Sequence, residues 1–207
     1  MHGKKGIPRY AREEFLFLRS GICHIQGMDE LMEILQSAGQ KPIGLGNQVV
    51  IFPYSGRVIG MFPEPGLNAL WINPALASKE NAAAMFGETG WINSGGIRGW
   101  ISPEFETHVG DVGRFWDTYA VSPEVDPGAY RLASSDETSA TLEMEMSPRF
   151  HHSQGMVPLR LRRTVSMLEA PLESLPAGVS HTGIALESEL SANGDLPPGV
   201  RPGLWNL

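Results

Sequence analysis

The sequence predicts a mainly β protein, an antiparallel β-sandwich preceded by a short helical extension. Strand-length runs rich in Val, Ile, Phe and Trp are separated by turns that contain Gly and Pro, and no helices alternate with them. Glycine and proline supply 24 and 16 of the 207 residues. Their combined share exceeds the usual value of roughly 12%, which indicates many turns and disfavours a helical bundle.

The first regular element is expected to be a helix over residues 29–38. Apolar side chains recur there at spacings of three, four and seven, which places them on one face. Asp29 can cap the first turn, and Gly39 can end the helix in a left-handed conformation. The apolar face consists of Leu31, Ile34, Leu35 and Ala38.

Short strands are expected from residue 48 onward. Residues 141–146 alternate strictly between polar and apolar, as in a strand with one face on a core and the other in water. Residues 53–56 and 63–66 contain Pro and Gly and are expected to form turns. The predicted strands are 48–52, 57–62, 68–72, 99–102, 130–133, 140–146, 159–168 and 179–190, with another beginning at Trp205.

The predicted organisation is an N-terminal extension, residues 1–40, followed by a β-sandwich domain, residues 41–207. Residues 1–27 hold five basic and two acidic side chains. That balance is typical of an appended tail, and equally of an ordinary helix with a solvated basic face. At the other end the chain stops as a strand begins, so either it ends on a buried strand or it is the N-terminal fragment of a longer protein.

Composition disfavours several classes of protein. Because 16 Lys and Arg face 23 Asp and Glu, the net charge is −7, which disfavours a nucleic-acid partner. The single cysteine, Cys23, rules out an internal disulfide framework and a cysteine-rich zinc site. The longest early apolar run, residues 15–18, is too short for a signal peptide or a membrane span. A cytoplasmic protein without a membrane partner is therefore expected.

No residue set predicts a cofactor or a metal site. The chain lacks a phosphate-binding loop ending in GK[ST], a G-x-S-x-G elbow and an H-E-x-x-H pair. His151 and His152 are adjacent, and neighbouring residues on a strand point to opposite faces. We expect these two histidines in an exposed loop between Pro148 and Gly155.

The richest candidate site is the stretch 94–108, which follows a flexible pair of glycines at 95 and 96. Trp offers an apolar face for a sugar ring, and charged side chains can grip neighbouring hydroxyls. Arg98 and Glu104 are six residues apart, so in an uninterrupted strand they would share a face. The competing interpretation makes Trp100 part of the core and Arg98–Glu104 a structural ion pair. The chemistry-bearing residues of this stretch are Arg98, Trp100, Glu104, Glu106 and His108.

Five segments also occur in a recognisable order: V-V-I-F-P-Y-S-G-R-V-I-G (49–60), L-W-I-N-P-A-L (70–76), G-G-I-R-G-W-I-S-P-E (95–104), F-W-D-T-Y-A-V-S-P-E-V-D (115–126) and L-R-L-R-R-T-V-S-M-L (159–168). This order resembles uncharacterised bacterial proteins of the galactose mutarotase-like (aldose 1-epimerase-like) superfamily, over residues 44–207. The resemblance implies a β-supersandwich whose concave face binds carbohydrate. Members of that superfamily are longer, which favours the interpretation of this chain as an N-terminal fragment.

The chain departs from that superfamily where its chemistry would be expected. Anomeric interconversion needs a base for the anomeric hydroxyl and an acid for the ring oxygen. Mutarotases generally use a late glutamate and a histidine on a central strand. Residues 190–194, the comparable region here, contain no histidine, and nothing after Leu207 supplies the glutamate. Little or no mutarotation of glucose or galactose is expected, and whether the chain is an enzyme stays open.

The leading hypothesis is therefore a carbohydrate-binding protein related to aldose epimerases, with a small-molecule sugar as its partner. Arg98 and Glu104 are expected to bind hydroxyls, Trp100 and Trp116 to stack on the sugar, and Arg57 to fix a turn or reach the site. For Arg57 the structural role is the stronger interpretation. The competing hypothesis is a non-catalytic β-sandwich module for assembly, and unpaired final strands would favour a homodimer or other self-association.

Overall fold

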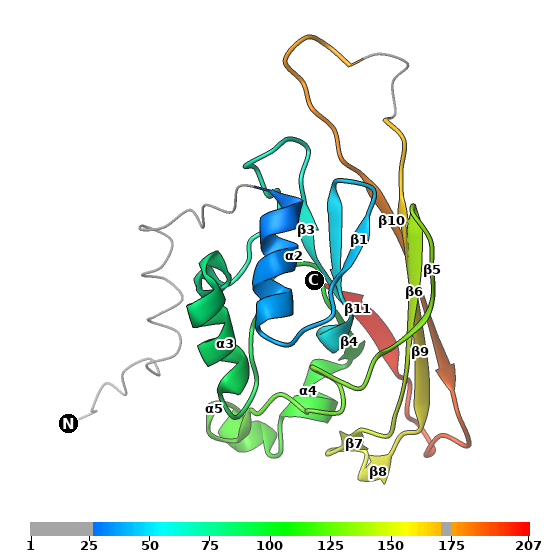
Figure 1. The fold of residues 1–207 in the computed structure, drawn as a ribbon. Helices are drawn as coiled ribbons and strands as arrows, with labels where there is room; N and C mark the ends of the chain where they lie inside the picture. The colour runs from blue at the N-terminus through cyan, green and yellow to red at the C-terminus, as the bar shows by residue number, and fades with distance from the viewer. Residues whose placement is uncertain (1–26, 171–174) are drawn as a thin grey trace, which may run out of the picture.

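The computed structural model describes residues 27–170 and 175–207 of the chain (Figure 1). Of these residues 35% lie in strands and 21% in helices. Every pair of strands is antiparallel and no sheet closes on itself. The prediction of a mainly antiparallel β protein is confirmed. The basic stretch before residue 27, with Cys23, lies outside the described residues.

A three-stranded sheet forms the middle layer. Its strands are β1 (Ile43–Leu45), β2 (Val49–Phe52) and β3 (Arg57–Met61), in that order, with the short helix η2 (Pro53–Ser55) joining the last two. All four side chains of β2 are buried, because layers cover both faces of the sheet.

A four-stranded sheet packs on one face of the middle layer. The strands β5 (Arg131–Ser135), β6 (Ser139–Met146), β9 (Leu159–Met167) and β10 (Ile184–Ala192) lie in the order β10-β9-β6-β5. Their inward side chains meet those of the three-stranded sheet and form one apolar layer between the sheets. Its buried members are Leu45, Val49, Ile51, Val58, Ala140, Leu142 and Val165.

The outer face of the four-stranded sheet is polar. Glu143 accepts hydrogen bonds from Arg131 at 2.7 Å and Arg160 at 3.0 Å, and Arg162 lies 3.8 Å away. The hydrogen bond from Arg160 contributes most to lowering the pKa of Glu143. This row of cross-strand pairs explains the polar half of the alternation in β6 and β9.

Two helices cover the other face of the middle layer (Figure 1). The first, α2 (Met28–Ser37), confirms the predicted helix within one residue at each end. Gly39 ends it at φ 76° as expected, but Gly27 occupies the N-cap position and Asp29 lies inside the first turn, so the predicted capping role is wrong. The buried side chains under both helices are Leu31, Ile34, Leu35, Val50, Phe52, Ile59, Phe62, Ile72, Leu76, Ala82 and Met85.

The second helix, α3 (Lys79–Gly87), was not predicted from the sequence. Ser78 Oγ accepts a hydrogen bond from the backbone N–H of Asn81 at 3.2 Å and caps its first turn. The alanines at 82–84 favour helix without making a strongly amphipathic pattern, which is why periodicity does not reveal it. The preceding short helix η3 (Pro74–Ala77) leads into it.

Two predicted strands need correction. Residues 68–72 are not a strand, because the Asn68 side chain bonds to the backbone of Met61 and Ile59 and takes the places that a neighbouring strand would use. Only Ile72 makes an isolated bridge, to Gly95. The strand predicted at 179–190 begins at Ile184 instead, where β9 ends and no partner remains for the earlier residues.

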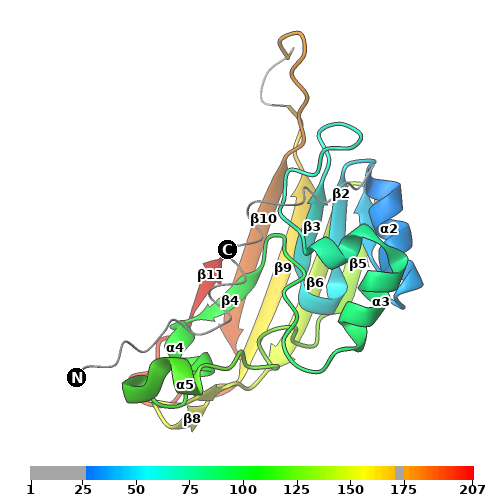
Figure 2. The same cartoon turned by 90° about the vertical axis from the view of Figure 1, so that its left-hand side faces the viewer.

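The remaining elements gather at one end of the molecule (Figure 2). They are β4 (Gly99–Ser102), α4 (Glu104–His108), η4 (Val112–Arg114), α5 (Phe115–Thr118), β7 (Arg149–Phe150), β8 (Gly155–Met156) and β11 (Gly203–Asn206). β11 pairs with β4, so a strand around Trp205 is confirmed. A second apolar cluster, which includes Trp100, Ile101, Leu159 and Leu161, joins this end to β9.

The division into an extension of residues 1–40 and a domain of residues 41–207 stays a prediction, since residues 1–26 are not described. Within the described part, α2 shares its core with β2 and β3. No helix in residues 27–170 and 175–207 is long and apolar enough to cross a membrane.

Glu106 fastens α4 to the turn between β7 and β8. Its carboxylate accepts hydrogen bonds from the backbone N–H groups of His152 and Ser153 and from Ser153 Oγ at 2.9, 3.1 and 2.7 Å. Burial works to raise the pKa of Glu106, but the bonds from Ser153 and His152 outweigh it and hold the pKa below its usual value. The carboxylate therefore stabilises the fold above the unfolded pKa of about 4.3, and this contribution disappears as the pH falls through the folded pKa.

We predict that Glu106→Gln lowers the melting temperature at pH 7, and that its difference from the natural chain shrinks as the pH falls below about 4. Thermal melts followed by circular dichroism between pH 7 and pH 3 provide the measurement. Glu88→Gln, at an exposed position after α3, is the control and should show no such pH-dependent difference. A constant difference between Glu106→Gln and the natural chain over this range would contradict the assigned role.

Candidate functional site

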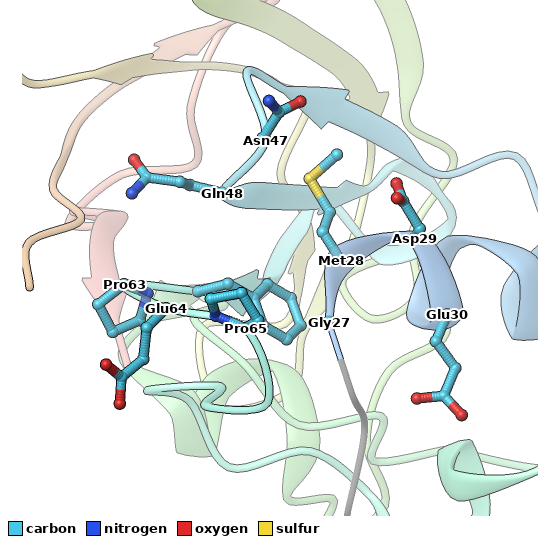
Figure 3. A pocket seen from close by; sticks show the side chains of 10 residues that line it. Gly27, Met28, Asp29, Glu30, Asn47, Gln48, Pro63, Glu64 and Pro65 are labelled. Carbon is cyan, nitrogen blue, oxygen red and sulfur yellow. The ribbon is translucent and has the colours of Figure 1, made fainter.

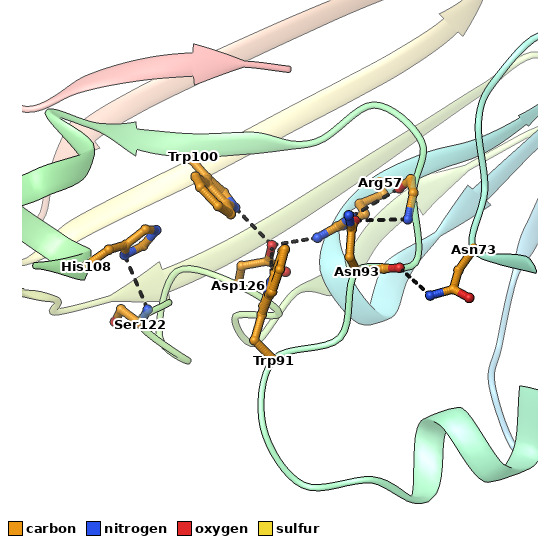
Figure 4. Close-up of polar contacts among 9 residues, drawn as sticks. Arg57, Asn73, Trp91, Asn93, Trp100, His108, Ser122 and Asp126 are labelled. Atoms are coloured by element: carbon orange, nitrogen blue, oxygen red, sulfur yellow. Dashed lines mark hydrogen bonds and ion pairs between the residues drawn. The ribbon is translucent and has the colours of Figure 1, made fainter. Parts of the chain in front are cut away.

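A buried ion pair between Arg57 and Asp126 lies at the centre of the candidate site (Figure 4). Arg57 NH2 donates to Asp126 Oδ2 at 2.6 Å, and the two residues are 1% and 4% exposed. Arg57 NH1 also donates to Asn93 Oδ1 and to the carbonyl of Gly95, both at 3.1 Å. Burial lowers the pKa of Arg57, and the charge of Asp126 works against that shift.

Two indoles converge on the same carboxylate oxygen. Trp91 Nε1 and Trp100 Nε1 donate to Asp126 Oδ2 at 3.0 and 2.9 Å, in addition to Arg57 (Figure 4). The other oxygen of Asp126, Oδ1, is buried and has no hydrogen-bond partner among the described residues. One carboxylate thus joins β3, the loop before β4 and β4 itself.

The glycines at 95 and 96 hold that loop against its neighbours. Both adopt left-handed backbone conformations, with φ of 85° and 75°. A Cβ at Gly95 would collide with the backbone of Trp71, and one at Gly96 with the carbonyl of Val58. Glycine is needed at both positions, because only glycine permits this close backbone approach.

Arg98 leaves this loop with its guanidinium against both indoles. Its Cζ lies 4.1 Å from the ring centroid of Trp100 and 5.6 Å from that of Trp91. The two indole rings meet edge to face, 6.1 Å apart at 63°. Such cation–π contacts contribute about 0.5–2 kcal/mol each, depending on how far water is excluded. The indole orientation that Asp126 sets therefore also positions the arginine.

A second polar pair lies beside this cation. Tyr119 Oη donates to Glu104 Oε1 at 2.6 Å. Burial raises the pKa of Tyr119, and the hydrogen bond to Glu104 raises it further, so the phenol keeps its proton. Trp116 continues the aromatic surface, with its ring centroid 6.2 Å from that of Tyr119 and 75% of its surface exposed.

His108 completes the inner wall. Its ring lies edge to face with Trp100, with centroids 4.8 Å apart, and Nδ1 accepts from the backbone N–H of Ser122 at 3.2 Å. The neutral ring therefore carries its hydrogen on Nε2, which is buried without a partner among the described residues. Burial lowers the pKa of His108, which favours this neutral form.

Of the five predicted site residues, the structure brings three together around Asp126, places Glu104 beside them, and leaves Trp116 at the edge of the site. Arg98 and Trp100 are in contact, and Arg57 lies behind them, joined through Asp126. Glu104 does not continue strand β4, as the spacing argument required, because β4 ends at Ser102 and Glu104 opens α4. No ion pair joins Arg98 and Glu104, and Trp116 lies outermost on α5.

Sequence reasoning missed several members of the site. Trp91, Tyr119 and Asp126 supply an indole wall, a partner for Glu104 and the central carboxylate. A signal for the first existed, since W-I-N occurs at both 71–73 and 91–93. An aspartate placed between Val125 and Pro127 was the corresponding signal for the carboxylate.

Arg163 is a second buried arginine that the sequence did not single out. It points inward from β9, is 1% exposed, and contacts Gly99 of β4, where a Cβ would collide with NH1. It also lies beside the hydroxyl of Tyr130, whose pKa it works to lower although burial raises that pKa overall. None of its N–H groups has a well-formed hydrogen bond among the described residues.

The two histidines and the pocket at the start of α2 lie apart from these residues. His151 and His152 lie in the turn between β7 and β8, as expected, and no group of three His, Cys, Asp or Glu among the described residues could hold an ion. An open cavity of about 550 Å³ lies between the start of α2 and the turns at 47–48 and 63–65 (Figure 3). It contains none of the predicted site residues, and its rim includes Gly27, where the described chain begins.

Comparisons with protein-family models, with curated proteins and with solved structures found no match to this chain. The resemblance to the mutarotase-like superfamily therefore stays a prediction.

We predict that Asp126→Asn destabilises the fold by about 3–5 kcal/mol, because it leaves the buried guanidinium of Arg57 uncompensated. Urea unfolding followed by tryptophan emission measures this, and the emission of the folded variant should also change, because Trp91 and Trp100 then face a neutral amide instead of a carboxylate. Asp111→Asn is the matched control. That residue pairs with Arg114 on the surface, so its replacement should leave stability unchanged. Equal behaviour of the two variants would contradict the central role of Asp126.

Replacing Arg163 is expected to have the opposite effect. Arg163→Met keeps most of the side-chain volume and removes buried donors that lack partners, so we predict a gain of about 1–3 kcal/mol in the free energy of unfolding. The control Arg162→Met, on the exposed outer face of the same strand, should not stabilise the protein. A loss of stability in Arg163→Met would mean that the guanidinium has a favourable role in the folded protein.

Proposed function

We propose that this chain is a carbohydrate-binding protein whose binding surface is formed by Trp91, Arg98, Glu104 and Trp116, with the buried ring of Trp100 beneath Arg98. The observation that carries the proposal is the guanidinium of Arg98 held against two adjoining indoles, beside the Glu104–Tyr119 pair. Sugar-binding surfaces combine aromatic faces, on which the apolar side of a ring stacks, with a few fixed polar groups that take its hydroxyls. A cytoplasmic location and a supersandwich fold related to aldose epimerases belong to the same proposal.

We propose binding without turnover. An epimerase needs a base and an acid that reach one sugar together. The nearest candidates here are already engaged, since Glu104 accepts the hydroxyl of Tyr119 and His108 is buried with Nδ1 bonded to Ser122. Mutarotation of glucose or galactose should therefore stay at its uncatalysed rate.

A second candidate function is assembly with another copy of the chain. β5 and β10 are the edges of the four-stranded sheet, and all five residues of β5 are exposed. Leu132 and Trp205 are among the large apolar residues exposed at the surface. Open edges with apolar side chains favour strand pairing between copies. Light scattering tests this, and a dimer without sugar binding would favour assembly over the carbohydrate proposal.

The binding proposal predicts that galactose or glucose changes the tryptophan emission in a saturable way. Trp116→Ala and Arg98→Ala should each weaken binding by roughly tenfold or more, about 1.4 kcal/mol. The melting temperature should fall by only about 2–4 °C, because these contacts contribute about 1 kcal/mol to stability. Isothermal titration calorimetry measures the affinities.

Tyr54→Ala is the matched control, since Tyr54 is also an exposed aromatic residue and its ring packs on Phe52 and Phe86, away from the site. Its sugar affinity should equal that of the natural chain. Unfolding of Arg98→Ala, or unchanged affinity in both site variants, would refute the proposed surface.

A further inference from the structure

Arg98 carries a positive charge with no ion-pair partner among the described residues. Arg57 pairs with Asp126, whereas Arg98 takes part in no ion pair and its side chain donates no hydrogen bond in the described part of the chain. The two nearby carboxylates each have one oxygen engaged elsewhere. Oδ2 of Asp126 accepts from Arg57 and two indoles, and Oε1 of Glu104 accepts from Tyr119.

The surroundings of Arg98 strengthen its attraction for an anion. Its Nε is buried and unpartnered, and two adjoining indole rings lie against the guanidinium, so water reaches the group incompletely. Removal of water lowers the local dielectric constant and strengthens any ionic interaction there. A guanidinium whose outer N–H groups remain free is suited to a planar, two-oxygen acceptor.

We propose that the natural ligand is an acidic sugar, a hexuronate, whose carboxylate pairs with Arg98 while its ring lies on the aromatic surface. This inference rests on the proposed carbohydrate-binding function and names the class of sugar. A neutral sugar would leave the cation unpaired. A dianionic sugar phosphate would bring two negative charges to one arginine with Glu104 and Asp126 close by, which disfavours it.

Because the chain as a whole is acidic, a preference for acidic sugars would have to arise within the site. The net charge is −7, so the protein as a whole repels anions, and non-specific attraction cannot account for uronate binding. Any preference for an acidic over a neutral sugar must come from the site itself.

The test compares matched pairs of sugars by calorimetry and tryptophan emission: glucuronate with glucose, and galacturonate with galactose, with glucose 6-phosphate as the third anion. We expect at least one uronate to bind tenfold or more tightly than its neutral partner. That advantage should shrink as salt rises from 20 to about 500 mM, whereas the affinity for the neutral sugar stays constant.

Variants assign the effect to the guanidinium. Arg98→Gln should reduce uronate affinity to that of the neutral sugar. Arg98→Lys should keep part of the uronate affinity, because lysine supplies the positive charge but not the bidentate donor geometry of arginine. Arg162→Gln removes an arginine from the outer face of the sheet and should bind as the natural chain does. Thermal melts of each variant show whether it is folded.

Equal binding of neutral and acidic sugars, tighter binding of the phosphate, or a uronate preference that survives Arg98→Gln would overturn the hexuronate assignment and leave the carbohydrate proposal standing. Absence of binding by every sugar, with the protein folded, would overturn both.

Discussion

The buried carboxylate of Asp126 is the constraint on which this structure most depends. Removing a charged pair from water costs several kcal/mol per ion, and only close pairing with further hydrogen bonds offsets that cost. Asp126 meets this requirement through Arg57 and two indole N–H groups. Its partners come from β3, from the loop before β4 and from β4, so the carboxylate fixes how the middle sheet and the second half of the chain meet.

The same interaction couples stability to the candidate site. The indoles that donate to Asp126 turn their faces toward Arg98, so the geometry of the surface depends on a bond made beneath it. The structure favours the interpretation of Trp100 as a core residue over its predicted role of stacking on a sugar. Its ring is buried and belongs to the core, yet one face is the wall against which the arginine is held.

How much the sequence could predict depended on whether the signal was local. Periodicity located α2 and most strands, because burial of one face leaves a regular pattern in neighbouring residues. It failed at residues 68–72, where one side chain, Asn68, replaces a strand partner, and at α3, whose alanines lack a clear pattern. The site followed the same rule: Arg98 and Trp100 stand two residues apart, whereas Asp126 reaches Trp100 from a distant segment, and its position beside Pro127 does not say which residues it will contact.

The site differs from the outer face of the four-stranded sheet in how its arginines are paired. Arg57 and Arg98 lie at its centre, and Arg163 points inward from the sheet behind β4, while Asp126 is the carboxylate in direct ionic contact with one of them. The carboxylate of Glu104 accepts a hydrogen bond from the hydroxyl of Tyr119 and forms no ion pair with an arginine of the described residues. The outer face of the sheet shows the reverse arrangement, where the carboxylate of Glu143 is surrounded by three arginines. Arg98, by contrast, lies against two indoles without an ion pair among the described residues, and this contrast is the basis of the proposal that the site takes an anionic sugar.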